Sequence, residues 1–185
     1  MGRHPMILLL AALLIPDVPV IDQTGQALHF HRDLIAGRVV VVAFFFTSCE
    51  DACPMVAHTL VALQQARRDL AIVSVSLDPE HDTPERLAAW ARRYGVKKGW
   101  TLVTGSPASM RQLARAMTGD DAKPNLHGAV LYIGNDRTGE WVRDTGTAAP
   151  AHYLELLRKV KVGPALSRPP GSLDAGPAGS RPYIP

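Results

Sequence analysis

The sequence contains little cysteine: Cys49 and Cys53 are its only two among 185 residues. Two cysteines exclude a disulfide-stapled scaffold, and they also exclude a zinc site built from cysteine alone. The pair could still form a disulfide, act as a redox pair, or contribute to a metal site with mixed ligands.

Aromatic residues are also scarce, at 6%, and the chain has no long run of basic residues. Its formal charge of +3 includes cations that occur in pairs, such as Arg67–Arg68, Arg92–Arg93 and Lys97–Lys98. Few aromatics and no basic block argue against nucleic-acid binding, so we expect no nucleic-acid partner. Hydrophobic residues make up 46% of the chain, which is enough for the core of one ordinary domain.

The two ends of the chain differ in composition from its middle. Residues 6–15 form an unbroken apolar run, signal-like in length but too short to cross a bilayer of roughly 30 Å. We interpret residues 1–15 as a signal-like or truncated anchor segment, with a buried first strand as the alternative. The protein is then exported, and is either periplasmic or membrane-associated through its N-terminus, facing the periplasm. Residues 163–185, rich in Gly and Pro, predict a disordered tail.

The remaining residues, 16–162, have the size of a single folded domain in which strands alternate with helices. The run from Val39 to Phe46 is apolar without alternation, which is typical of a central strand covered on both faces. Further strands are predicted at 71–77, 100–104, 129–133 and 140–143, and helices at 54–70, 84–94, from 107, and at 149–160. This order predicts an α/β fold with a central mixed sheet flanked by helices.

The two cysteines lie where the strand at 39–46 leads into a helix. Three residues separate Cys49 from Cys53, so on a first helical turn they would share one face and could bind one object. Backbone N–H groups and the helix dipole at a helix N-terminus favour the thiolate, which is the form that binds metals and exchanges disulfides. The pattern therefore predicts a reactive pair rather than two inert buried cysteines.

The segments around this pair resemble those of the Sco/SenC family. They are FTSCEDACP at 46–54, VSVSLDPEHDTP at 73–84, His127 ahead of an apolar strand, and the opening segments IPDV at 15–18 and DQTG at 22–25. The resemblance implies a thioredoxin-like fold with an N-terminal strand and hairpin extension. It also implies a copper metallochaperone that delivers copper to the binuclear copper centre of cytochrome c oxidase, or maintains the thiols of that centre.

By the same resemblance, the ligands of copper are Cys49, Cys53 and His127. Two soft thiolates and an imidazole suit Cu(I) and tolerate Cu(II), whereas structural zinc normally needs a fourth protein ligand. The chain has Glu50 where the family usually has proline, and Leu126 where it usually has aspartate. Both departures predict a shifted copper affinity or redox poise.

Other candidate ligands are weaker. His81 lies in the loop of the second motif and ranks behind His127. Asp78 of that loop is a candidate for a hydrogen-bond partner behind the ligands, while Asp82 is expected to shape the turn before the next helix. Met55 and Met117 are predicted to pack in the core rather than to bind metal.

The implied partners are the copper-bearing subunit of cytochrome c oxidase, or another copper protein, and a thiol reductant, because an exported pair tends to oxidise. Two further functions would use the same cysteines: a thiol–disulfide oxidoreductase and a copper or redox sensor. Thioredoxin-like exchange normally uses two intervening residues, so the spacing favours a metallochaperone over an enzyme. A peroxiredoxin-like peroxidase fits poorly, because Thr47 is only two residues ahead of Cys49.

Overall fold

The computed structural model describes residues 9–10, 15–49, 52–119 and 130–162. Its strands are β1 (Leu9–Leu10), β2 (Pro19–Asp22), β3 (Ala27–His29), β4 (Val39–Phe45), β5 (Ala71–Ser76), β6 (Trp100–Thr104), β7 (Val130–Asn135) and β8 (Glu140–Thr145). Its helices are the short π-helix η1 (Phe30–Ile35) and α1 (Ala52–Ala66), α2 (Pro84–Tyr94), α3 (Pro107–Thr118) and α4 (Pro150–Val162).

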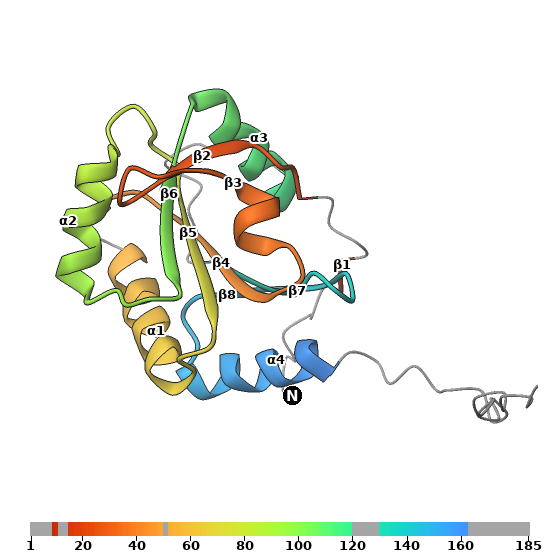
Figure 1. The fold of residues 1–185 in the computed structure, drawn as a ribbon. Helices are drawn as coiled ribbons and strands as arrows, with labels where there is room; N and C mark the ends of the chain where they lie inside the picture. Colours follow the sequence, from red (N-terminus) through yellow and green to blue (C-terminus); the bar gives the residue numbers. More distant parts are fainter. Residues whose placement is uncertain (1–8, 11–14, 50–51, 120–129, 163–185) are drawn as a thin grey trace, which may run out of the picture.

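The strands form one mixed sheet in the order β1-β8-β7-β4-β5-β6-β2-β3, with β4 inside it as predicted (Figure 1). Strands β4, β5 and β6 are parallel, because α1 and α2 return the chain to the start of the next strand. The β7–β8 hairpin extends the sheet on one side and the β2–β3 hairpin on the other, both antiparallel. We call the end of the sheet where β4, β5 and β6 finish the C-terminal edge, and the end where they start the N-terminal edge.

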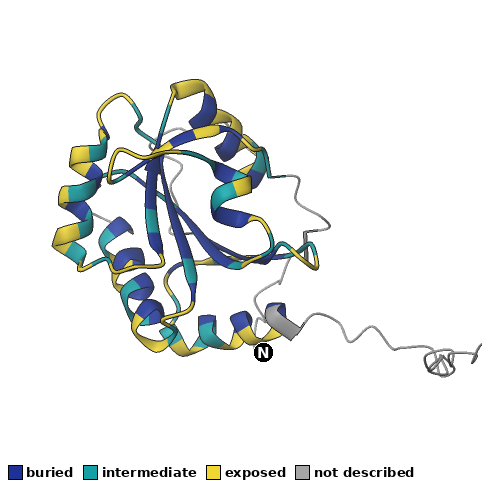
Figure 2. Ribbon diagram, viewed as in Figure 1, coloured by how far each residue is buried: buried dark blue, intermediate teal, exposed yellow. Residues whose placement is uncertain are grey.

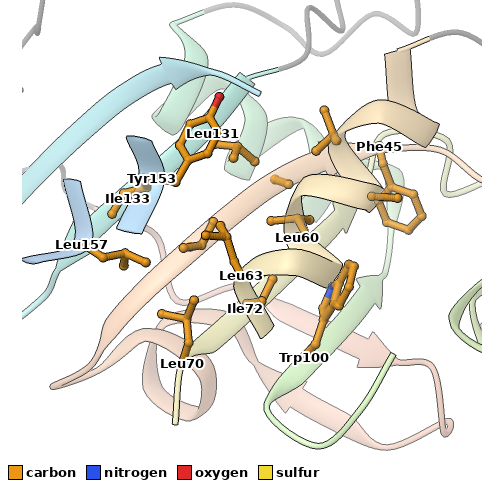
Figure 3. Packing of buried hydrophobic residues seen from close by; sticks show 14 of the residues in the cluster. Phe45, Leu60, Leu63, Leu70, Ile72, Trp100, Leu131, Ile133, Tyr153 and Leu157 are labelled. Atoms are coloured by element: carbon orange, nitrogen blue, oxygen red, sulfur yellow. The ribbon is translucent and has the colours of Figure 1, made fainter. Parts of the chain in front are cut away.

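Helices cover both faces of the sheet, so its strands are buried on two sides (Figure 2). On one face, Leu60 and Leu63 of α1 pack against Ile72 of β5, with Leu131 and Ile133 of β7 beside them (Figure 3). On the other face, side chains of η1 and α3 cover Val73 and Val75. Each fully buried aliphatic side chain contributes roughly 1.5–3 kcal/mol, so these two clusters hold the sheet that positions the cysteine loop.

Helix α2 spans the predicted range and is capped at both ends. Thr83 is the N-cap, and its side-chain oxygen accepts a hydrogen bond from the Arg86 N–H at 3.4 Å, with Pro84 at the first helical position. Gly95 ends the helix with a φ of 67°, a left-handed conformation that glycine adopts without steric cost. Helix α2 is therefore fixed at both ends by its caps.

Part of the apolar N-terminal run lies at the edge of the sheet. Leu9 and Leu10 form β1 and pair with Val142 and Trp141 of β8. Within the described ranges, no helix is long and apolar enough to span a membrane. Residues 163–185, for which we predict disorder, lie outside the described residues.

Candidate metal and thiol site

The cysteine loop connects the C-terminal end of β4 to the start of α1. Cys49 lies in the turn after β4, and its N–H donates to the Phe46 carbonyl at 3.2 Å. Because α1 begins at Ala52, Cys53 lies in the first helical turn and Cys49 lies ahead of it. The helix thus begins two residues earlier than the predicted 54, and the shared-face argument does not hold for Cys49, because the chain is still in the turn after β4 at that residue.

The two thiols nevertheless come together at the start of the helix. The Cys53 N–H donates to Cys49 Sγ at 3.4 Å, so the Cys49 sulfur lies where α1 presents its free N–H groups. Such a position favours negative charge on sulfur. Both cysteines are free thiols; Cys49 is half-buried, whereas Cys53 is only 6% exposed and packs in the core cluster beneath α1.

Burial, and after it the hydrogen bond with Cys49, raise the pKa of the Cys53 thiol to about 12. The negative charge of Asp82 adds to this effect. At Cys53 the loss of hydration outweighs the opposing backbone hydrogen bond with Phe46, so the thiol form is favoured there and not the thiolate expected from the helix N-terminus. Cys49 is thus the accessible thiol. Cys53 loses its thiol proton when a metal ion binds to its sulfur and displaces that proton.

A buried carboxylate, Asp82, anchors the loop that carries the cysteines. Asp82 is 1% exposed, and its side chain accepts hydrogen bonds from the Thr47 N–H, from Thr47 Oγ1 at 2.5 Å and from Ser76 Oγ at 2.7 Å. Thr47 lies two residues before Cys49, and Arg86 Nε of α2 donates to its hydroxyl at 3.3 Å. The end of β5, the start of α2 and the cysteine loop are therefore joined through one side chain.

From the sequence, Asp82 is expected only to shape the turn, and nothing there indicates its contact with the cysteine loop. The one feature of the sequence that points to Asp82 is its position in the second motif, directly ahead of the N-cap residue Thr83. An aspartate in a turn commonly hydrogen-bonds to nearby backbone while its side chain is exposed to solvent. The motif alone therefore does not indicate that Asp82 is buried.

Asp78, the expected partner behind the ligands, points to a different residue. Its carboxylate bonds His81 Nδ1 at 2.8 Å, and this hydrogen bond raises the pKa of His81, which is 69% exposed. The Asp78 carbonyl accepts from the N–H groups of His81 and Asp82, so the residue does shape the turn. Among the described residues, no hydrogen bond joins Asp78 to either cysteine, and its role behind the ligands stays a prediction.

The third expected ligand, His127, lies outside the described residues, as do Glu50 and Leu126. In the part of the chain that is described, no three His, Cys, Asp or Glu side chains are grouped so as to hold a metal ion. The structure thus brings together Cys49 and Cys53, two soft donors that fit copper chemically. The complete ligand set stays a prediction.

The remaining candidates separate by their surroundings. His58 is exposed and lies edge-on to the ring of Tyr94, with 6.0 Å between the ring centres. Met117 is buried as predicted. Met55, in contrast, is 53% exposed, and the prediction that it packs in the core was wrong. It lies two residues after Cys53, and two residues rotate a helix by more than half a turn, so the cysteine faces the core and the methionine does not.

A central strand that leads into a helix through a Cys-x-x-x-Cys turn, on a mixed sheet covered by helices, defines a thioredoxin-like protein with a dithiol site. The SCO1/SenC family model matches residues 12–123. The chain belongs to this family.

Relatives and solved structures agree with this membership. The SCO2-like protein of Rickettsia prowazekii (strain Madrid E) is 33% identical over 154 residues, which cover 76% of this chain and 69% of the relative. The crystal structure of a SCO1/SenC family lipoprotein from Bacillus anthracis str. Ames superposes with a TM-score of 0.71 at 22% identity, covering 86% of this chain and 99% of that one.

Two further solved structures share the fold. BsSco, described with a disulfide switch as a member of the Sco family of cytochrome c oxidase assembly proteins, has a TM-score of 0.67 at 23% identity, over 85% of this chain and 96% of that one. ScoI from Bradyrhizobium japonicum with copper bound has a TM-score of 0.60 at 21% identity, over 78% and 99%. These likenesses confirm the predicted thioredoxin-like fold.

Proposed function

We propose that this protein is a copper metallochaperone that supplies copper to the binuclear copper centre of cytochrome c oxidase, or maintains the thiols of that centre. The observation that carries the proposal is the contact between the Cys53 N–H and Cys49 Sγ, which brings two soft donors together at the N-terminus of α1. Membership of the SCO1/SenC family supports it, as do the copper-bound structure from Bradyrhizobium japonicum and the oxidase-assembly role stated for BsSco.

Copper is the cargo of this site, held by Cys49, Cys53 and His127. The half-buried Cys49 meets an incoming ion first, and Cys53 binds it with loss of the thiol proton. Three protein ligands leave room for a donor atom of the client to enter before the original ligands leave. Asp82, through Thr47, keeps the cysteine loop in place during this exchange.

The pair must be reduced before it can bind copper, because a disulfide offers no thiolate. A thiol reductant is therefore a required partner. We place the protein outside the cytoplasmic membrane, attached through its N-terminal segment; the apolar run at 6–15 and the likeness to a Bacillus anthracis lipoprotein support this location.

A thiol–disulfide function is the second candidate, favoured by the unequal exposure of the two thiols. The accessible Cys49 would attack a partner's disulfide, and the buried Cys53 would then attack the mixed disulfide and release the reduced partner. The protein's two thiols become a disulfide, and the partner gains both electrons and both protons. A disulfide switch is described for the related BsSco. A copper or redox sensor would use the same residues.

An anaerobic titration of the reduced full-length chain with Cu(I) and Cu(II) tests the first proposal, with Cys49→Ser, His127→Ala and the matched exposed control His58→Ala. We expect one tightly bound equivalent, loss of binding in Cys49→Ser, a changed thiolate-to-Cu(II) absorption in His127→Ala, and no change in the control. A reduced protein that binds no copper but reacts rapidly with disulfides would favour the second candidate instead.

A further inference from the structure

Two of the basic pairs noted in the sequence, Arg67–Arg68 and Lys97–Lys98, meet at the N-terminal edge of the sheet. A groove of about 970 Å³ lies there, between the end of α1, the start of β5 and the loop from α2 to β6. Four cations line this groove, and a neighbouring hollow adds two more. We call these six residues the basic edge: Arg38, Arg67, Arg68, Lys97, Lys98 and Arg137.

The basic edge concentrates the positive charge of the molecule. Among the described residues, Asp69 is the only acidic one that lines either hollow, so six cations face one carboxylate and their surplus is five charges. The whole chain has a net charge of only +3, so the rest of the molecule is net negative. The asymmetry gives this edge a positive field that the overall charge understates.

These cations stand on anchored loops. The buried Gln64 of α1 accepts from the Lys97 N–H at 3.0 Å and donates to the Lys97 carbonyl at 3.0 Å. Gly99 has a φ of 97°, and a Cβ there would lie 3.1 Å from the Leu70 carbonyl oxygen, so the loop packs tightly on the start of β5. On the other side, Arg137 Nε donates to the Gly37 carbonyl at 2.7 Å.

Most of this charge is uncommitted within the protein. Asp69 pairs with Arg67, whose Nε and Nη2 donate to its two oxygens at 3.0 and 2.9 Å. Among the described residues, the exposed side chains of Arg38, Arg68, Lys97 and Lys98 share these hollows with that one carboxylate, which already pairs with Arg67. Cations in excess at one end favour an anionic partner that lies outside the molecule.

We propose that the basic edge docks on an anionic membrane surface, where its cations contact lipid phosphates. Helix α1 has 15 residues and is about 22 Å long, and it separates the cysteines at its start from Gln64 and the basic edge near its end. A client that receives copper must reach the cysteines. A membrane bound at the opposite edge leaves the cysteines accessible and facing away from the bilayer. This argument for the orientation rests on the proposed function, whereas the docking itself rests on the charge of the basic edge.

The test compares binding of the full-length chain to two kinds of vesicle, one of equal parts phosphatidylglycerol and phosphatidylcholine and one of phosphatidylcholine alone. The ratio of the two partition coefficients cancels the contribution of the apolar N-terminal run. Each cation at an anionic surface contributes roughly fivefold to binding, so Lys97→Glu with Lys98→Glu should lower the ratio about tenfold or more. High salt should lower the wild-type ratio in the same way.

The matched control is Arg111→Glu with Arg143→Glu, which changes the net charge equally at exposed positions outside the basic edge. We expect the control to keep most of the wild-type ratio. An equal loss in both variants, an unchanged ratio in the Lys97 and Lys98 variant, or tight binding to an oligonucleotide without preference for the anionic vesicles would overturn the proposal.

Two measurements on the same samples separate this proposal from the proposed function. Copper titration should give the same stoichiometry in both charge variants. A failure to bind copper would count against the proposed metallochaperone function and not against the membrane docking. A maleimide reagent that cannot cross membranes should label Cys49 equally fast in free and vesicle-bound protein. Slower labelling of the bound protein would overturn the proposed orientation, in which the cysteine edge faces away from the membrane.

Discussion

At the scale of single residues, the two cysteines of one motif have different chemical environments. Cys49 is half-buried in a turn and its sulfur accepts an N–H at the start of α1, whereas Cys53 is buried in the core beneath the same helix. Burial raises the pKa of Cys53 to about 12. The pair therefore consists of an accessible thiol and a protonated, protected one.

This difference predicts unequal alkylation. At pH 8 only about one Cys53 in ten thousand is a thiolate, so iodoacetamide should modify Cys49 at least about tenfold faster than Cys53 in the reduced protein. Peptide mass spectrometry over time measures both rates, and Cys53→Ser serves as the control in which Cys49 still reacts. The rate at Cys53 should rise with pH up to its pKa; equal rates at pH 8 would contradict the assignment.

Asp82 gives a second prediction at this scale. Asp82→Asn replaces a carboxylate that accepts three hydrogen bonds, so we expect about 1–3 kcal/mol of destabilisation in urea unfolding and faster hydrogen exchange at the Thr47 amide. The matched control is Asp78→Asn, which removes a bond to the exposed His81 and should cost less than about 1 kcal/mol. Similar losses in the two variants would argue against an anchoring role for Asp82.

At the scale of elements, much of the fold follows from patterns within the sequence. The strand over 100–104 and the helix over 84–94 were predicted correctly, because apolar periodicity and capping chemistry act over a few residues. The start of α1 was not predicted correctly, because it depends on the length of the turn after β4. That turn still includes Cys49, so this residue precedes the helix. The exposure of Met55 depends on that same start, which fixes the face of α1 it occupies.

Contacts between distant elements were beyond prediction. The hydrogen bond from Thr47 to Asp82 joins residues 35 apart, and no spacing in the sequence indicates it. The same holds for the meeting of Arg68 with Lys97 and Lys98 at one edge, which depends on the pairing of β5 with β6. The cysteine motif was recognisable, but its anchor was not.

The β7–β8 turn gives a prediction about pH. Asp136 accepts from the Gly37 N–H at 2.7 Å and pairs with His31 Nε2 at 2.9 Å. Burial opposes its charge, but these two bonds hold the pKa of Asp136 below its ordinary value of 3.8. A carboxyl group whose pKa is lower in the folded than in the unfolded protein stabilises the fold at pH values above its unfolded-state pKa. That stabilisation is lost as the pH falls through its folded-state pKa.

We therefore expect Asp136→Asn to be about 1 kcal/mol less stable than wild type at pH 6, with the difference shrinking as the pH falls below 3.8. Urea unfolding as a function of pH measures both proteins. A constant difference down to pH 2 would show that the charge of Asp136 is not what stabilises the turn.

At the scale of the whole molecule, the two functions that we propose use opposite edges of one sheet. The cysteine pair lies at the C-terminal edge, where loops of parallel α/β sheets generally carry binding sites, and the basic edge lies at the other end. The covered faces between them are core (Figure 2). This division lets a membrane and a copper-receiving client approach the molecule without competing for the same surface.

We propose above all that Cys49, Cys53 and His127 together hold the copper ion. X-ray absorption spectroscopy of the Cu(I)-loaded full-length chain is the sharpest test, because it counts sulfur and nitrogen donors around the metal. We expect two sulfur donors and one nitrogen donor in the wild type, with the nitrogen lost in His127→Ala and retained in His58→Ala. A wild-type site with sulfur donors alone, or one whose nitrogen donor survives His127→Ala, would contradict it.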